Sequence, residues 1–235
     1  MMASLIGAAA ASLRAEEPPI QVNPNRPTFA TPASTTQVGV AELELGLEQT
    51  LLREAGGVFF SPFLLKLGLT KRIELRLGGG GLLHDRQSGV LAATGFGDVK
   101  LSGQWCYLRD GPLGIDQAVQ VTWKIPAASA PKGLGTGDSD GTLMALLSRD
   151  LGPFHADANL LLTWLGRPLA AGGGMEFQPS ATLSVSRTLA TQWSLTGEVY
   201  WIGASFENAR SSPTSGPPAT RSLPASYSTL GSTSG

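Results

Sequence analysis

The stretch TKRIELRLGGGG, Thr70–Gly81, alternates charged and aliphatic residues. One set of alternate positions, the charged parity, holds Arg72, Glu74 and Arg76. The other set, the aliphatic parity, holds Ile73, Leu75 and Leu77. Successive side chains of a β-strand point to opposite faces, so the stretch predicts a strand with one ionic and one aliphatic face. The glycines that follow predict that the strand end bends into a loop.

The same two-residue period recurs from Gln37 to Phe206 and predicts about nine strands of roughly ten residues each. Their approximate positions are 41–48, 59–70, 70–81, 97–107, 116–125, 142–149, 154–164, 177–187 and 192–201. About ten residues is the length that a tilted strand needs to cross a membrane. No stretch approaches the roughly 20 apolar residues of a membrane-spanning helix.

The predicted connections differ in length. Tight connections fall at 69–71, 108–112, 149–153 and 188–192, and longer ones at 52–57, 81–95, 126–141 and 166–176. Because tight and long connections alternate, all tight turns are expected at one end of an up-and-down meander. Short turns at one end and longer loops at the other are typical of outer-membrane barrels.

Periodicity alone does not say which face points outward, but the composition of the two faces does. The apolar parity carries aromatic residues near strand ends, as interfacial girdles do: Trp105, Tyr107, Trp123, Trp164 and Trp201. The polar parity is rich in Ser, Thr and Gln, which is typical of a wet lumen. We therefore predict an all-β fold, an up-and-down antiparallel transmembrane β-barrel. The alternative is a soluble β-barrel or sandwich with its apolar face inside.

Composition limits the function classes. The 235 residues carry a net charge of −1, which gives no indication of nucleic-acid binding. The one cysteine, Cys106, excludes a disulfide within the chain and argues against a paired-thiol metal site. We expect no cofactor, no metal and no catalytic residue, because neither His84 nor His155 has a sequence-evident Ser partner.

The periodic region divides the chain into four parts. Residues 1–15 resemble a partial signal peptide, 16–36 are predicted to be an N-terminal periplasmic segment, 37–206 the barrel, and 207–235 a disordered or non-native tail. Bacterial barrels have even strand numbers, so we expect the natural barrel to continue and this chain to be truncated or frame-shifted near Asn208.

Several motifs stand in an order that resembles one family of outer-membrane proteins. They are Asn25-Arg26-Pro27, GLTKRIELRLGGG (68–80), GFGDVKLSGQWCYL (95–108), VTWKIPAAS (121–129) and LLSRDLGPFHADANLLLTW (146–164). The chain resembles the transporter family named for the MetA pathway of phenol degradation, over roughly Asn25 to Glu207. The resemblance implies an outer-membrane β-barrel that passes hydrophobic or aromatic small molecules.

The charged and amide residues of the polar parity are predicted to line the lumen. They are Glu42, Glu44, Lys66, Arg72, Glu74, Arg76, Asp98, Lys100, Gln104, Lys124, Asp157, Asn159 and Glu198. They either shape permeation or pair across strands and stiffen the interior. Because Glu74 is expected to face the lumen, Glu74→Gln is expected to matter little to folding.

The sequence thus predicts a channel or transporter for small molecules, hydrophobic or aromatic ones among them, in the outer membrane of a Gram-negative-type bacterium. Its expected partners are outer-membrane lipid, the barrel assembly machinery and a small-molecule solute, and the sequence leaves the oligomeric state open. The alternatives are a soluble secreted β-barrel that binds a lipophilic ligand, and a structural surface barrel without transport.

Overall fold

The computed structural model describes residues 19–20, 22–25, 28–52, 56–87, 93–169, 172–190, 193–203 and 231–232. The predicted signal peptide, 1–15, lies outside the described residues. The described chain is all-β, as predicted, with two short 3-10 turns, η1 (Pro112–Gly114) and η2 (Ala130–Lys132).

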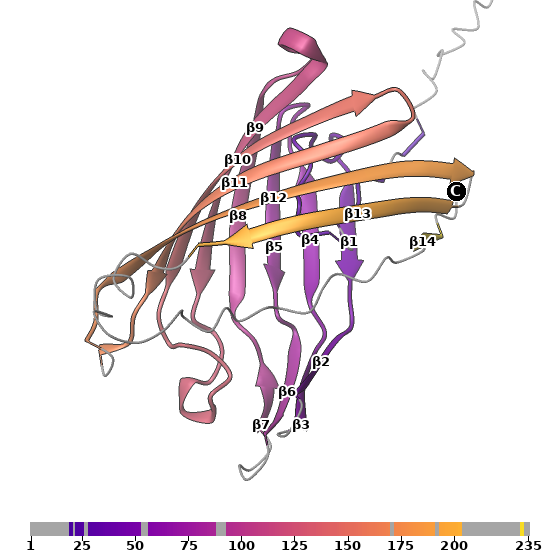
Figure 1. Ribbon diagram of the computed structural model, residues 1–235. Helices are drawn as coiled ribbons and strands as arrows, with labels where there is room; N and C mark the ends of the chain where they lie inside the picture. Colours follow the sequence, from indigo (N-terminus) through magenta and orange to yellow (C-terminus); the bar gives the residue numbers. More distant parts are fainter. Residues whose placement is uncertain are drawn as a thin grey trace, which may run out of the picture.

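A large antiparallel sheet makes up most of the structure (Figure 1). Its strands, in spatial order, are β1 (Ala41–Leu45), β4 (Phe63–Gly68), β5 (Ile73–Gly79), β8 (Val99–Leu108), β9 (Ile115–Ile125), β10 (Asp140–Leu151), β11 (Phe154–Gly166), β12 (Met175–Ala190), β13 (Trp193–Ile202) and β14 (Gly231–Ser232). A second antiparallel sheet contains β2 (Glu48–Leu52), β3 (Gly56–Phe60), β6 (Leu82–Gln87) and β7 (Ala93–Phe96). Its four strands prolong β1, β4, β5 and β8 beyond a common bend.

Glycines allow the backbone to bend between the two sheets. The peptide N–H of Ser61 donates to the carbonyl of Leu82, and that of Gly97 donates to Gly81, both at 2.9 Å, so pairing continues through the bend. Gly81 has φ +58°, and a Cβ there would overlap the carbonyl oxygen of Ser61. The glycines therefore bend a long strand in its middle. The prediction of a loop at 81–95 is wrong, because that range contains β6 and most of β7.

The tight turns β4–β5, β8–β9, β10–β11 and β12–β13 lie at one end of the sheet, and the other connections lie at the opposite end (Figure 1). The predicted strict alternation of short and long connections is wrong in one place. β2 ends at Leu52 and β3 begins at Gly56, a shorter connection than the one from Leu108 to Ile115. We call the two ends the tight-turn end and the loop end.

The sheet is not closed into a barrel. Among the described residues, no strand pairing joins β1 to β13. The described part of the chain is therefore an open antiparallel sheet of nine up-and-down strand runs, followed by the short β14, and the predicted closure into a barrel is not seen in it. Gly231 and Ser232 of the predicted unpaired tail pair with Ser194 and Trp193; residues 204–230 and 233–235 lie outside the described part of the chain.

The two faces of the sheet are the reverse of those of an ordinary water-soluble protein. On β5, Leu75 is 40% exposed, whereas Glu74 is 0% exposed. Lys66 on β4 is also completely buried, and its neighbour Leu67 is exposed. We call the face with Lys66 and Glu74 the inner face and the face with Leu75 the outer face. Charged and polar side chains are buried on the inner face, and large apolar side chains are exposed on the outer face.

Aromatic residues of the outer face gather toward the strand ends. Trp105 lies toward the tight-turn end of β8, and Trp123 and Trp164 flank Gly141 in one cross-strand row near the loop end. Phe154 and Trp164 stand at opposite ends of β11. At about 3.4 Å per residue and a tilt of about 40°, the two rings are separated by about 25 Å along the axis of a barrel.

The positive φ and close packing at Gly81 predict a measurable cost for a side chain there. Gly81→Ala is expected to lower the free energy of unfolding by about 1–3 kcal/mol, because of backbone strain and the overlap with Ser61. The control is Gly141→Ala, where an added Cβ meets nothing within 4 Å. Urea unfolding in detergent, followed by tryptophan fluorescence, measures both. Equal effects of the two substitutions would contradict this account of the bend.

Candidate functional site

Residues 28–37, which we call the inner segment, lie across the inner face of the sheet. Their backbone contacts side chains of β13, β11, β10, β8 and β5 in turn. A single short segment reaches all these strands, so the inner face is concave. Residues 16–36 were predicted to form an N-terminal periplasmic segment; within this range, Asn23, Asn25 and residues 28–36 contact the inner face.

The start of the inner segment is held by Glu198 and Asn159. The two carboxylate oxygens of Glu198 on β13 accept hydrogen bonds from the peptide N–H groups of Phe29 (3.0 Å) and Ala30 (2.7 Å). The side-chain amide of Asn159 on β11 accepts from the N–H of Thr31 at 2.7 Å and donates to its carbonyl at 2.9 Å. Asn159 thus satisfies both backbone groups of one residue, as a neighbouring β-strand would.

The middle of the inner segment is held by Gln104 and Ser148. The amide nitrogen of Gln104 on β8 lies within 3.2 Å of three consecutive carbonyl oxygens, those of Pro32, Ala33 and Ser34. The hydroxyl of Ser148 on β10 accepts from the N–H of Ala33 at 2.7 Å. The side chain of Ala33 is fully buried and packs in a small apolar cluster with Cys106, Ala118, Met144 and Leu146.

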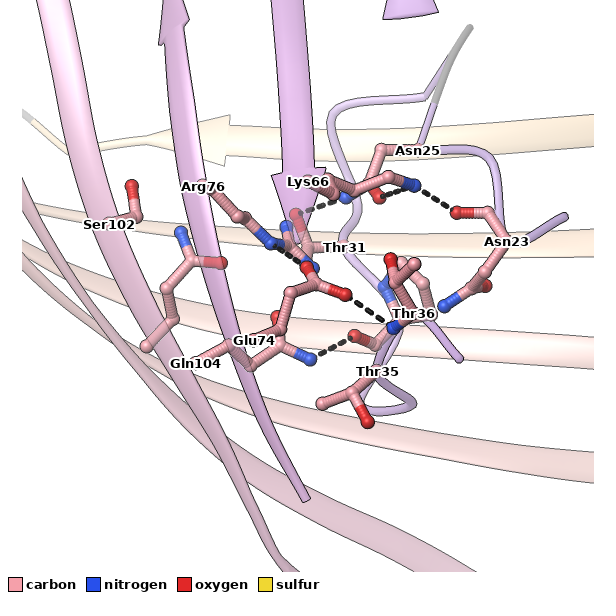
Figure 2. A network of polar contacts seen from close by, with 12 residues as sticks. Asn23, Asn25, Thr31, Thr35, Thr36, Lys66, Glu74, Arg76, Ser102 and Gln104 are labelled. Atoms are coloured by element: carbon pink, nitrogen blue, oxygen red, sulfur yellow. Dashed lines mark hydrogen bonds and ion pairs between the residues drawn. The ribbon is translucent and has the colours of Figure 1, made fainter. Parts of the chain in front are cut away.

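Two groups of buried charges complete the interior (Figure 2). Glu74 accepts hydrogen bonds from the N–H of Thr36 and from the guanidinium of Arg76. Lys66 forms ion pairs with Glu42 at 3.1 Å and Glu44 at 2.7 Å. Those carboxylates also accept from the peptide N–H groups of residues 23 and 25, at 3.2 and 3.0 Å.

Glu74→Gln is therefore not the harmless change that the sequence suggests. It would leave the guanidinium of Arg76 buried without its counter-ion, which is costly in a protein interior.

The inner segment joins β1 through a notch at Gly68. The N–H of Gly39 donates to the carbonyl of Gly68 at 2.8 Å, and the N–H of Gly68 donates to Val40 at 3.1 Å. A Cβ on Gly68 would overlap the carbonyl oxygens of Thr36 and Gln37. Gly39 has φ +77°, which turns the chain into β1. These backbone contacts anchor the C-terminal end of the inner segment.

A separate polar cluster lies at the loop end. Lys124 forms ion pairs with Asp140 at 2.8 Å and Asp98 at 3.5 Å. Asp98 also accepts from the N–H of Ala128 at 3.0 Å, which fixes the start of the β9–β10 loop. Lys100, the cross-strand neighbour of Lys124, is exposed.

A chain of polar contacts runs along the tight-turn end. The hydroxyl of Ser148 donates to Asp157 at 2.5 Å. The ring of His155 lies between Asp157 (3.1 Å) and Asp150 (2.6 Å). The Ser148 proton is directed at a carboxylate, so this arrangement does not present the Ser–His pair of a hydrolase.

The predicted lumen residues thus separate into three sets. Seven contact the inner segment or residues 23–25 directly: Glu42, Glu44, Lys66, Glu74, Gln104, Asn159 and Glu198. Two act through another side chain: Arg76 through Glu74 and Asp157 through Ser148. Four lie elsewhere: Asp98, Lys100 and Lys124 at the loop end, and Arg72, which is exposed in the β4–β5 turn.

Sequence reasoning missed Ser148 and the inner segment itself. One signal was present: on the inner face, Glu42, Glu44, Glu74, Asp157 and Glu198 outnumber Lys66 and Arg76. Buried carboxylates need hydrogen-bond donors, so an excess of acids indicates that donors come from elsewhere in the chain.

No helix in the described residues is long and apolar enough to span a membrane. No group of three or more His, Cys, Asp or Glu side chains among them is placed to hold a metal ion.

Comparison with known proteins gives no family assignment. No protein-family model matches the chain, and no curated protein matches it.

The buried cation on β4 gives a stability prediction. Lys66→Met is expected to lower the free energy of unfolding by about 3–5 kcal/mol, because Glu42 and Glu44 remain as buried like charges. Arg167→Met is the matched control. Arg167 pairs with Glu176 at 3.8 Å in a partly exposed site, so its loss is expected to cost less than about 1 kcal/mol. Urea unfolding measures both, and a Lys66→Met cost as small as the control's would contradict the buried ion-pair assignment.

Proposed function

We propose that the sheet is the wall of an outer-membrane β-barrel that serves as a channel or transporter for small molecules. The observation that carries the proposal is the reversed burial: Lys66 and Glu74 are 0% exposed, whereas Leu75 and Trp123 on the outer face are 40% and 55% exposed. Exposed apolar area on this scale is unfavourable in water and favourable in lipid. The expected partners remain outer-membrane lipid and the barrel assembly machinery.

The dimensions of the outer face support the same reading. The aromatic rings that end β11 are separated by about 25 Å along a barrel axis, which is the height of the apolar band of outer-membrane barrels. Polar outward side chains appear toward the tight-turn end, where Arg187 lies over the ring of Phe154 at 5.4 Å. Arginine and aromatic side chains are both suited to the boundary between lipid and water.

The alternatives account less well for the two faces. A soluble barrel that binds a lipophile needs an apolar interior. The described inner face instead carries carboxylates, amides and hydroxyls, such as the Ser102–Thr122 pair at 2.8 Å. A purely structural surface barrel has no need of an inner segment held by several strands.

The lining also bears on the solute. The resemblance to the MetA-pathway family implies hydrophobic or aromatic molecules. A polar, acidic lining favours small polar or cationic molecules instead, because the groups of the lining replace the hydrogen bonds that such a solute makes with water. Uptake experiments should therefore include both chemical classes.

Membrane insertion tests the outer face. Leu75→Arg is expected to reduce the stability of the lipid-inserted protein by about 2–4 kcal/mol if residue 75 lies near the bilayer midplane. Leu169→Arg is the control, because Leu169 is an exposed apolar residue in the β11–β12 connection. Folding titrations into phospholipid vesicles give the free energies. Equal tolerance of arginine at both positions, or recovery of the unmodified protein in a detergent-free soluble fraction, would refute the membrane assignment.

Solute flux tests the transport part of the proposal. Liposomes that contain the full chain are expected to take up small polar or cationic solutes faster than empty liposomes and faster than liposomes with heat-denatured protein. Aromatic solutes run in parallel to test the implication of the family resemblance. The absence of flux above empty liposomes for every solute class would defeat the transport proposal while leaving the membrane assignment to the insertion test.

A further inference from the structure

We propose that the inner face is a binding site for a peptide of small residues, and that the inner segment, residues 28–37, is its exchangeable resident ligand. This site differs from a pathway for small solutes, because it recognises a peptide backbone. It also regulates that pathway if the proposed function holds, because an occupied site fills part of the interior.

The wall side chains bind the peptide through its backbone. Glu198 accepts from two adjacent N–H groups, Asn159 binds the N–H and carbonyl of one residue, and Gln104 donates toward three consecutive carbonyls. Ser148 and Glu74 each accept from one further N–H group. Recognition of this kind depends on the path of the ligand's backbone and requires little from its side chains.

Burial sets the size of the accepted side chains. Ala30 and Ala33 are 1% and 0% exposed, so the wall leaves no room for a larger residue at either position. Phe29, by contrast, is mostly exposed and contacts Tyr200 with ring centroids 5.1 Å apart. The expected ligand therefore has small residues at the positions of Ala30 and Ala33 and tolerates a large one before them.

The attachments are of a kind that can be exchanged. Most hydrogen bonds between residues 28–36 and the wall use a wall side chain, which water or another peptide can replace; the hydroxyl of Thr35 also donates to the backbone carbonyl of Lys71 at 3.3 Å. The apolar part of the interface is small, because Ala33 is the inner segment's contribution to the buried cluster. Backbone bonding resumes at Gly39 and Gly68, which keep the segment tethered when it leaves.

The wall also retains unused hydrogen-bonding atoms beneath the segment. Oε1 of Gln104 and Nη2 of Arg76 are buried and have no hydrogen-bond partner among the described residues. Both side chains are more than nine-tenths buried and belong to the inner face. A site with spare donors and acceptors can accommodate ligands that carry more polar groups than the resident segment.

The chain contains a native reporter of occupancy. Cys106 is its one cysteine, is completely buried, and packs against Ala33 on the inner face. A maleimide reagent should reach the thiol only when the inner segment leaves, so the labelling rate follows the population of the open state. Labelling in detergent needs no transport activity, which separates this test from the test of the proposed function.

The main experiment places arginine in the buried position of the segment in the full chain. Ala33→Arg is expected to raise the rate of Cys106 labelling by roughly 10-fold or more over wild type, because the charged side chain does not fit the apolar cluster. Val38→Arg is the matched control, because Val38 is 47% exposed, and it should label at the wild-type rate. Wild-type labelling as fast as that of Ala33→Arg would overturn the proposal.

Binding in trans is tested on the same variant. A synthetic peptide with the sequence of residues 28–37, added to Ala33→Arg, is expected to slow Cys106 labelling toward the wild-type rate. The same peptide with its own Ala33→Arg change should not protect. Equal effects of the two peptides would overturn the assignment of a peptide site.

A second pair of variants keeps the proposal testable if Ala33→Arg does not fold. Glu198→Gln weakens two charge-assisted hydrogen bonds and is expected to raise the labelling rate roughly 5-fold. Glu176→Gln is the same chemical change on β12, where the carboxylate pairs with Arg167, and should leave the rate unchanged. Equal rates for the two variants would count against the proposal. If Ala33→Arg labels faster but conducts no solute in liposomes, the transport proposal fails and the peptide site stands.

Discussion

The structure depends on the hydrogen bonding of charges that are removed from water. Lys66 and Glu74 are completely buried on the inner face, and an unpaired buried ion costs several kcal/mol. Lys66 is compensated by Glu42 and Glu44, and Glu74 by Arg76. The carboxylates also accept hydrogen bonds from the peptide N–H groups of Asn23, Asn25 and Thr36. The position of the N-terminal residues is thus a consequence of the charges on the strands.

One sheet therefore has two kinds of surface with different partners. The outer face exposes large apolar side chains, which are more stable in apolar surroundings than in water. The inner face carries buried hydrogen-bond acceptors, which need donors. The inner segment supplies these donors because its peptide N–H groups face the wall and most of its residues are small. Pro32 has no peptide N–H and disfavours a regular ladder within this stretch, so the other N–H groups remain available to the wall.

The alternation of faces was readable from the sequence, and the content of the interior was not. Period-2 patterning around Glu74 and Leu75 assigns each side chain to a face, and the structure agrees with those assignments on β5. The inner segment has no period to read, and its partners are remote: Ala30 and Glu198 are 168 residues apart. The sequence predicted a bend at these glycines but not the strand β6 that follows it, because the polar residues of 84–87 resemble those of a loop. Local patterns determine faces, whereas contacts at long separation depend on the assembled sheet.

That separation has a consequence for the order in which the molecule forms. The acceptor that holds Phe29 and Ala30 is on β13, the last long strand among the described residues. Closing so long a loop is entropically costly until the strands between have paired with their neighbours. The residues that leave the ribosome early are therefore among the last to reach their final place. Until then the carboxylates of the inner face are hydrated. Water therefore leaves the inner face only after the sheet is complete.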